Sequence, residues 1–142
     1  MMKRIVVFLL VGFLFFLLTS PVSAEESIEY KLAVIDTQEP VERSGIKVAR
    51  FRSLLNQLST TYVETKQQIA DMTVFAKQDL RKSGIKESML NMMEGMNKLL
   101  PQKISNQKYA EYLTMYITLR DKGQSHTEAI SGIKALLKAF IK

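Results

Sequence analysis

The chain has 142 residues, 20 of them basic and 14 acidic, with a formal net charge of +6. It contains no cysteine, which excludes disulfide frameworks, thiolate zinc sites and cysteine nucleophiles. Glycine and proline are scarce, with six and three residues, and this composition argues against a chain that is disordered throughout.

The first 24 residues have the layout of a secretory signal peptide. Lys3 and Arg4 give a positive start, residues 5–18 are all apolar, and the small residues Val22 and Ala24 precede a cleavage site. The alternative is an uncleaved amino-terminal anchor, but a transmembrane helix needs about 20 apolar residues and this run is shorter. We therefore expect cleavage after Ala24 and a mature protein that is periplasmic or secreted.

Charge is distributed unevenly along the expected mature chain, which is long enough for one compact domain. Residues 25–42 carry six acidic residues and one basic residue, whereas residues 43–142 carry 17 basic and eight acidic residues. The acidic lead could lie against the basic body as an internal counterion or extend into solvent as a tail. Segments that follow a signal cleavage site are often mobile, so we expect an acidic extended lead over residues 25–40.

Within this lead, residues 28–36 are the one strand-like segment, and we expect them to be extended or to form one short strand. The pattern changes from Val48 onward, where apolar residues recur in steps of three and four, which predicts one face of a helix. We predict a single long helix from Val41 to Lys82. A break near residues 59–61 is the alternative, because Thr61 and Glu64 fit a capping box. The apolar set is Val48, Phe51, Leu55, Leu58, Tyr62, Ile69, Met72 and Ala76.

Three shorter helices are predicted to follow. The first spans residues 86–100 and ends at Pro101; the second is capped by Ser105 and ends at Lys122, before Gly123. A capping box over residues 125–128 opens the last helix. Its expected inner face is Ala129, Ile130, Ile133, Leu137, Phe140 and Ile141. Short connections favour antiparallel neighbours, so residues 41–142 are predicted to form an all-α, small antiparallel helical bundle of four or five helices.

Four methionines in the second predicted helix share one helical stripe. Clustered thioethers could hold Cu(I), but no cysteine or nearby histidine supports a metal site. Methionine also fills gaps in a core, or it forms an adaptable surface for partners of imperfect shape. We choose the surface as the hypothesis to test. The candidate partner face is Met89, Met92, Met93, Met96, Lys86 and Lys98.

Catalytic groups are hard to find in the sequence. His126 stands alone at the start of the last helix, and nothing in the sequence nominates a group that would orient it as a general base. The dipeptide Glu87-Ser88 resembles the catalytic dipeptide of peptidoglycan-cleaving transglycosylases, but the glycine-rich signature that accompanies it in that family is missing downstream. We therefore predict no catalytic residue, no metal and no cofactor.

Two basic stripes remain, one formed by Arg43, Lys47 and Arg50 and the other by Lys134, Lys138 and Lys142. The expected function is that of an exported helical protein that binds a macromolecular partner, a protein of the envelope or the extracellular space. The alternative is a peripheral binder of anionic membrane or cell-wall surfaces through the basic body. Nucleic acid is not an expected partner, because the chain is predicted to be exported and its aromatic residues do not interleave with the basic ones.

Overall fold

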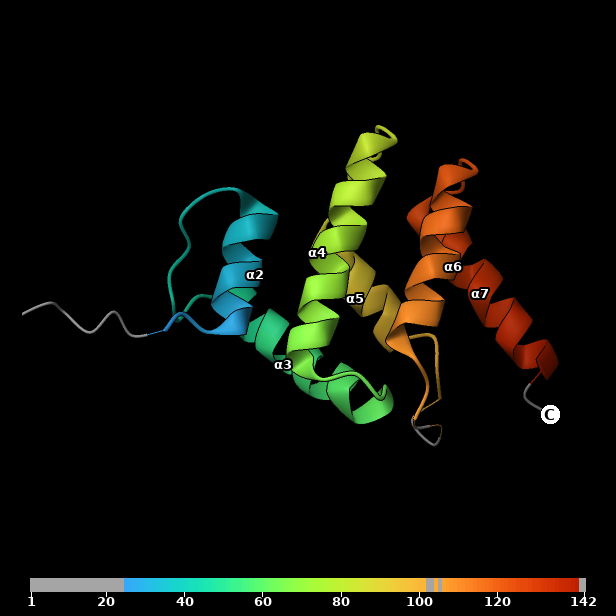
Figure 1. Cartoon of the computed structure of the whole chain (residues 1–142), viewed down its shortest axis with the longest axis horizontal. Helices are drawn as coiled ribbons and strands as arrows, with labels where there is room; N and C mark the ends of the chain where they lie inside the picture. Colours follow the sequence, from blue (N-terminus) through green and yellow to red (C-terminus); the bar gives the residue numbers. More distant parts are fainter. Residues whose placement is uncertain (1–24, 102–103, 105, 141–142) are drawn as a thin grey trace, which may run out of the picture.

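The computed structural model describes residues 25–101, 104 and 106–140, so the predicted signal peptide lies outside the described residues. The described chain folds into six α-helices packed as a compact bundle (Figure 1), and this part of the chain contains no β-strand. The helices are α2 (Ile28–Thr37), α3 (Ile46–Thr61), α4 (Lys66–Lys82), α5 (Met89–Asn97), α6 (Tyr109–Asp121) and α7 (His126–Phe140). The all-α prediction is confirmed, with six helices in place of four or five.

The short helix α5 lies at the centre of the bundle. It contacts each of the other five helices, and it runs behind α4 and α6 in Figure 1. Its buried residues are Met89, Leu90, Met92, Met93, Gly95 and Met96. Burial of a methionine side chain stabilises a fold by roughly 1.5–3 kcal/mol, so the four methionines supply a large share of the core's apolar contribution.

The segment predicted to be extended is instead the helix α2. Ser27 caps it by accepting a hydrogen bond from the Tyr30 N–H at 3.4 Å, and Leu32 and Ala33 are buried in the core. The weak alternation of this segment came from one buried strip on a short helix, which has a period of 3.6 residues, and not from a strand.

The acidic lead also lies against the basic body, contrary to the expected tail. Glu29 accepts a hydrogen bond from Arg52 Nε at 2.9 Å, and an oxygen of Glu26 lies 3.3 Å from Arg43. Burial by itself would raise the pKa of Glu29, but the hydrogen bond from Arg52 and its positive charge lower this pKa below the ordinary value. Glu29 is therefore a counterion to Arg52 of α3, and Glu26 is a counterion to Arg43 in the segment before α3.

The predicted long helix is broken between Thr61, where α3 ends, and Lys66, where α4 begins. The real capping box joins Thr65 and Gln68, four residues after the predicted one, with side chain-to-backbone hydrogen bonds of 2.9 and 3.2 Å. The apolar pattern does not reveal this break, because the apolar residues of α3 and those of α4 stay in phase across the turn. Both helices pack these residues into one core.

Tertiary hydrogen bonds stabilise the turn between α3 and α4. The Tyr62 hydroxyl donates to the Met96 carbonyl oxygen at 2.8 Å, and the Val63 N–H donates to the Gln107 carbonyl oxygen at 2.9 Å. The buried Glu64 carboxylate accepts the backbone N–H groups of Tyr109 (2.8 Å) and Ala110 (3.2 Å). A carboxylate at a helix N-terminus accepts hydrogen bonds from the free N–H groups and interacts favourably with the helix dipole. Glu64 therefore caps the first turn of α6.

The remaining helix ends follow the sequence more closely. Glu128 Oε2 accepts the Ser125 N–H at 2.7 Å, and Ser125 Oγ accepts the Glu128 N–H at 3.3 Å, which confirms the capping box of α7. Helix α5 is shorter than predicted, because Ser88 caps it directly before Met89. Phe140, which was assigned to the inner face, is 83% exposed. Ser105, Ile141 and Lys142 lie outside the described residues.

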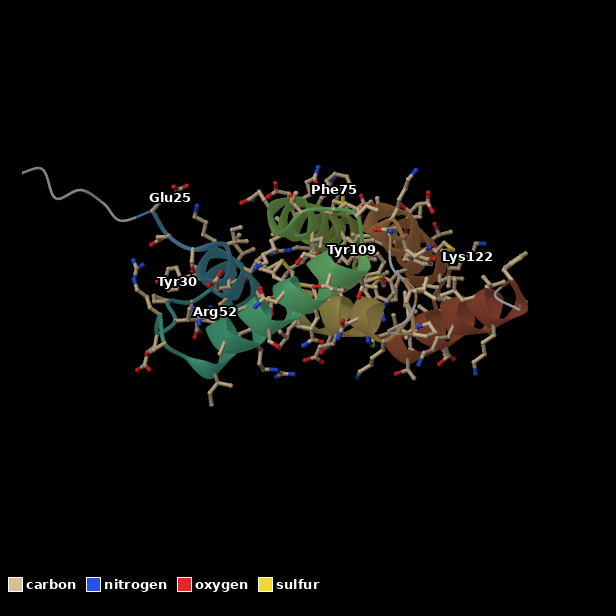
Figure 2. The ribbon with its side chains drawn as sticks, turned by 90° about the horizontal axis from the view of Figure 1, so that it is seen from below. Glu25, Tyr30, Arg52, Phe75, Tyr109 and Lys122 are labelled. Carbon is tan, nitrogen blue, oxygen red and sulfur yellow. The ribbon has the colours of Figure 1, made fainter. Side chains whose placement is uncertain are left out.

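Side chains in Figure 2 show how this core is closed. Tyr109 lies between the helices, with its ring 5.2 Å from that of Tyr62 in an edge-to-face arrangement, and its hydroxyl is 2.8 Å from that of Thr73. Phe75 lies on the outer side of α4 and is largely exposed. Glu25 and Lys122 lie toward opposite ends of the molecule in the same view.

Helix α7 approaches α5 closely because residue 95 is glycine. A Cβ atom at Gly95 would lie 2.6 Å from Ile130 Cδ1, 3.0 Å from Ile130 Cγ1 and 3.1 Å from His126 Cε1. At Gly132, another helical glycine, the nearest atom would be Leu119 Cδ1 at 3.7 Å, an ordinary contact. The two glycines form a matched pair for testing the packing of α7.

We predict that Gly95→Ala lowers the free energy of unfolding by about 1 kcal/mol, because overpacking of about 1–3 kcal/mol exceeds the gain in helix propensity of about 0.5–1 kcal/mol. Gly132→Ala should raise the free energy of unfolding by about 0.5–1 kcal/mol, since it brings the same gain without the overlap. Urea denaturation followed by circular dichroism measures both. A Gly95→Ala variant as stable as Gly132→Ala would show that α7 does not pack this closely.

Candidate functional site

The four methionines of the predicted partner face are core residues. Met89, Met92, Met93 and Met96 are each 0% exposed, so their thioethers are not available to a partner in this fold. The four methionines lie on one helix as predicted, but they face the core because α5 is surrounded by other helices. Lys86 and Lys98 are exposed and lie beyond the two ends of α5, where they line two separate recesses.

The first charged centre is Asp36, at the end of α2, whose side chain is 0% exposed. Its Oδ1 accepts hydrogen bonds from Lys77 Nζ at 2.9 Å and from the Met89 N–H at 2.7 Å, and its Oδ2 lies 3.1 Å from Lys47 Nζ. Burial alone would raise the pKa of Asp36, but these donors and the charge of Lys77 lower it below 3.8. Asp36 thus joins α2, α3 and α4 to the first N–H of α5.

The second charged centre is Glu87, directly before α5, whose side chain is 7% exposed. Its Oε2 lies 3.2 Å from Arg120 and 3.2 Å from the Tyr116 hydroxyl. Its Oε1 accepts the Ser88 N–H at 3.1 Å and Asn91 Nδ2 at 3.2 Å. Both carboxylate oxygens are therefore occupied, and Glu87 holds α6 against the start of α5.

His126 belongs to the same network. Its Nδ1 lies 2.8 Å from the Tyr116 hydroxyl and 3.8 Å from Glu87 Oε2. Burial and the neighbouring Glu87 raise the pKa of Tyr116 above its ordinary value, so this phenol stays neutral and serves as a hydrogen-bonding bridge. No partner for His126 could be predicted from the sequence, because Tyr116 and Glu87 meet it only when α6 and α7 pack against the start of α5. The one local signal of this network is the spacing of four residues between Tyr116 and Arg120, which places both side chains on one face of α6.

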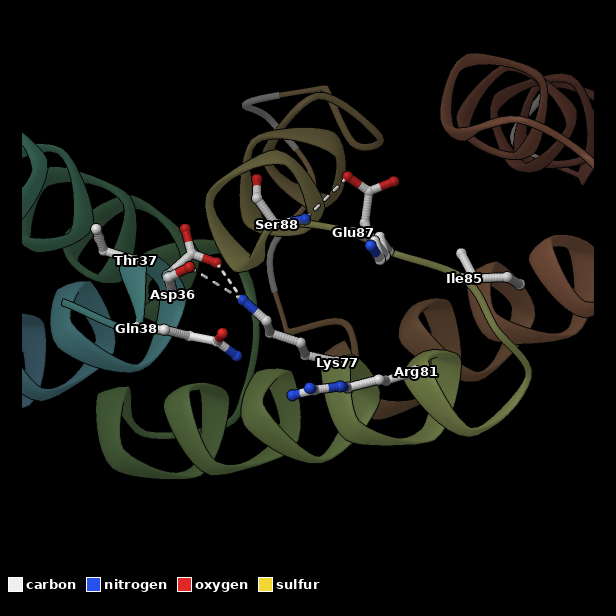
Figure 3. A pocket seen from close by; sticks show the side chains of 9 residues that line it. Asp36, Thr37, Gln38, Lys77, Arg81, Ile85, Glu87 and Ser88 are labelled. Atoms are coloured by element: carbon white, nitrogen blue, oxygen red, sulfur yellow. Dashed lines mark hydrogen bonds and ion pairs between the residues drawn. The ribbon is translucent and has the colours of Figure 1, made fainter.

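A first recess lies between α2, α4 and the start of α5 and has a cavity volume of about 430 Å³. Figure 3 shows Asp36 and Lys77 paired on one side, with Arg81 on α4 beside them and Gln38 facing from the end of α2. Glu87 and Ser88 close the opposite side in this view. The lining residues are Asp36, Thr37, Gln38, Lys77, Arg81, Ile85, Lys86, Glu87 and Ser88.

A second recess, which we call the α5–α7 groove, lies at the other end of α5 and has a volume of about 290 Å³. It is lined by Lys98, Leu99, Leu100, Pro101, Lys134, Leu137 and Lys138. Leu99 and Leu100 are mostly buried, whereas Leu136 and Phe140 on the same end of α7 are 52% and 83% exposed. The groove therefore combines an apolar floor with three lysines at its edge.

Two further findings concern the part of the chain that the structure describes. None of its helices is both long and apolar enough to cross a bilayer. It also contains no group of three or more histidine, cysteine, aspartate or glutamate side chains placed to hold a metal ion.

Comparison with known proteins gives a match to a family model. A family model described as MoxZ matches residues 33–136, which is more than half of the chain and extends from α2 into α7. No curated protein and no solved structure matches the chain. The matched range includes both charged centres and most of the lining of both recesses.

We predict that Asp36→Asn lowers the free energy of unfolding by about 2–4 kcal/mol at neutral pH, because it leaves Lys47 and Lys77 without their shared counterion. The folded-state pKa of Asp36 lies below the ordinary value of 3.8, so this stabilisation is complete above that value and is lost as the pH falls through the folded-state pKa. The difference in the free energy of unfolding between wild type and Asp36→Asn should therefore become smaller below pH 3.8.

Asp79→Asn is the matched control, because Asp79 is 40% exposed and lies 3.9 Å from Lys82 within one helix. Asp79→Asn should change the free energy of unfolding by no more than about 0.5 kcal/mol at either pH. Denaturant titrations of the three proteins at pH 7 and under acid conditions give the comparison. Equal stability of wild type and Asp36→Asn at pH 7 would contradict the structural role of Asp36.

Proposed function

The chain belongs to the MoxZ family, and we propose that it is an exported, non-catalytic protein whose α5–α7 groove binds an acidic, amphipathic segment of a partner protein in the envelope or outside the cell. The observation that carries this proposal is that three lysines and a floor of apolar side chains line the same recess. Binding a macromolecular partner was the expectation from sequence; the groove replaces the methionines as the proposed contact surface.

The shape of the groove supports a side chain of a partner as its occupant. Leu99 and Leu100 form a recessed floor between the end of α5 and the side of α7. A volume of about 290 Å³ accommodates one or two large apolar side chains, as when an amphipathic helix lays its apolar face in a groove.

The charge of the groove supports an acidic partner. Among the residues that the structure describes, Lys98, Lys134 and Lys138 have no carboxylate partner, whereas Lys47 and Lys77 are paired with Asp36. Lysines at the edge of an apolar patch pair with acidic side chains that flank the partner's apolar residues, and they accelerate association at low ionic strength. Binding should therefore weaken as salt is added.

An anionic membrane or cell-wall surface is the second candidate partner. Helix α7 carries the exposed Phe140 and Leu136 as well as Lys134 and Lys138, and this favours a membrane, because an amphipathic helix with lysines and exposed apolar side chains inserts at the interface of acidic lipids. The two candidates differ in what the groove itself contributes. A recessed floor is needed to bind a helix, whereas lipid insertion needs the exposed side chains alone.

We predict that reversing the charge of the groove abolishes partner binding. Protein immobilised as wild type or as Lys134→Glu/Lys138→Glu is incubated with the envelope fraction, and captured proteins are quantified by mass spectrometry. The variant should lose at least about tenfold of the specific capture, since opposite charges become like charges at the edge of the groove. The control is Lys31→Glu/Lys66→Glu, which makes the same charge change on α2 and α4 and should leave capture unchanged.

Flotation with vesicles that contain acidic lipid separates the second candidate. Salt-sensitive flotation that is lost in Leu136→Ser/Phe140→Ser, together with equal protein capture by wild type and the groove variant, would favour the membrane and refute the protein partner. Capture that persists unchanged in Lys134→Glu/Lys138→Glu without any flotation would contradict both.

A further inference from the structure

We propose that the recess between α2, α4 and the start of α5 is a binding site for a small dianionic molecule, such as a phosphate ester or a dicarboxylate. This site is separate from the α5–α7 groove, and the two recesses share no lining residue. Its cavity of about 430 Å³ falls in the usual range for small-molecule sites of roughly 300–1,000 Å³.

The charge balance of the recess favours an anion. Its two carboxylates are already neutralised, Asp36 by Lys47 and Lys77 and Glu87 by Arg120. Within the described part of the chain, Arg81 and Lys86 also line the recess and have no carboxylate partner. The recess therefore has an excess of positive charge over negative charge, which an anion would balance.

The two free cations differ in the hydrogen bonds that they offer. The Arg81 guanidinium presents a planar fork that matches two oxygens of a carboxylate or phosphate, whereas the Lys86 ammonium acts as a point charge. A ligand with two negative charges engages both groups, and one with a single charge engages one of them. We therefore assign a dianion, not a monoanion, to the recess.

Neutral groups supply the rest of a binding surface. Gln38 ends α2 in the left-handed conformation with φ of 61°, and Figure 3 shows its amide on the same side of the cavity as Lys77 and Arg81. Ile85 contributes an apolar wall. Because Asp36 fixes the ends of α2 and α5 to α4, the recess is formed before a ligand arrives, and little ordering is needed on binding.

The experiment is titration of the full mature protein with inorganic phosphate and, separately, with succinate, followed by amide chemical shifts in NMR. We expect saturable shifts at residues 36–38, 81 and 85–88 for at least one probe, and the tighter of the two identifies the head group. Acetate, which carries one charge, should bind more weakly by about tenfold, as expected for the loss of one charge-assisted hydrogen bond.

Variants make the test specific. Arg81→Gln and Lys86→Gln should each raise the dissociation constant of the anion by about tenfold or more. Arg81→Lys should raise it less than Arg81→Gln, because lysine keeps the positive charge but lacks the planar guanidinium. Lys66→Gln/Lys122→Gln is the matched control and should bind like wild type. Arg81 and Lys86 are exposed, so circular dichroism should show intact folds.

Shifts that are linear in probe concentration, or that are equal in wild type and Arg81→Gln, would overturn the proposal. The groove variant Lys134→Glu/Lys138→Glu should retain anion binding. Failure of partner capture would therefore leave this site standing, and failure of anion binding would leave the groove standing.

Discussion

The burial of α5 is the constraint on which the rest of the structure depends. This nine-residue helix contacts every other helix, and most of its surface is methionine, leucine or glycine in the core. Each of its ends is fixed by hydrogen bonds from elsewhere in the chain, at the Met89 N–H by Asp36 and at the Met96 carbonyl by Tyr62. Methionine suits such a position, because an unbranched and polarisable side chain fills the irregular gaps between helices that approach from several directions.

The charged side chains of this protein fall into a buried set that holds helices together and an exposed set that lines two recesses. The buried carboxylates Asp36, Glu64 and Glu87 are engaged by lysine, arginine or backbone N–H groups, and each joins elements that are distant in sequence. Leaving any of them without a partner would be costly, so they define which helix ends meet. Arg81, Lys86, Lys98, Lys134 and Lys138 lie at the surface instead and line two recesses beyond the two ends of α5. These two recesses are the surfaces at which we propose that anionic partners bind.

Local features of this fold were predictable from the sequence, whereas features that depend on tertiary contacts were not. The all-α class and the capping box of α7 follow from period and from residues three apart in the chain. The break after Thr61 depends on Tyr62 reaching Met96 and on Glu64 reaching Tyr109, contacts across more than 30 residues that no local pattern records. The direction of the methionine stripe was equally undecidable, because a stripe of apolar side chains reads the same whether a helix is central or peripheral. The Glu87 network needs three helices to assemble before its members meet.

Oxidation of methionine in the native protein tests the central position of α5 most directly. Mild peroxide treatment, quantified for each residue by mass spectrometry, compares the four buried methionines of α5 with Met72 and Met115, which are only partly buried. The structure predicts that Met72 and Met115 are oxidised first and that Met89, Met92, Met93 and Met96 react only when denaturant unfolds the protein. Oxidation of the four α5 methionines in the native protein at the rate of Met72 and Met115 would contradict the buried α5.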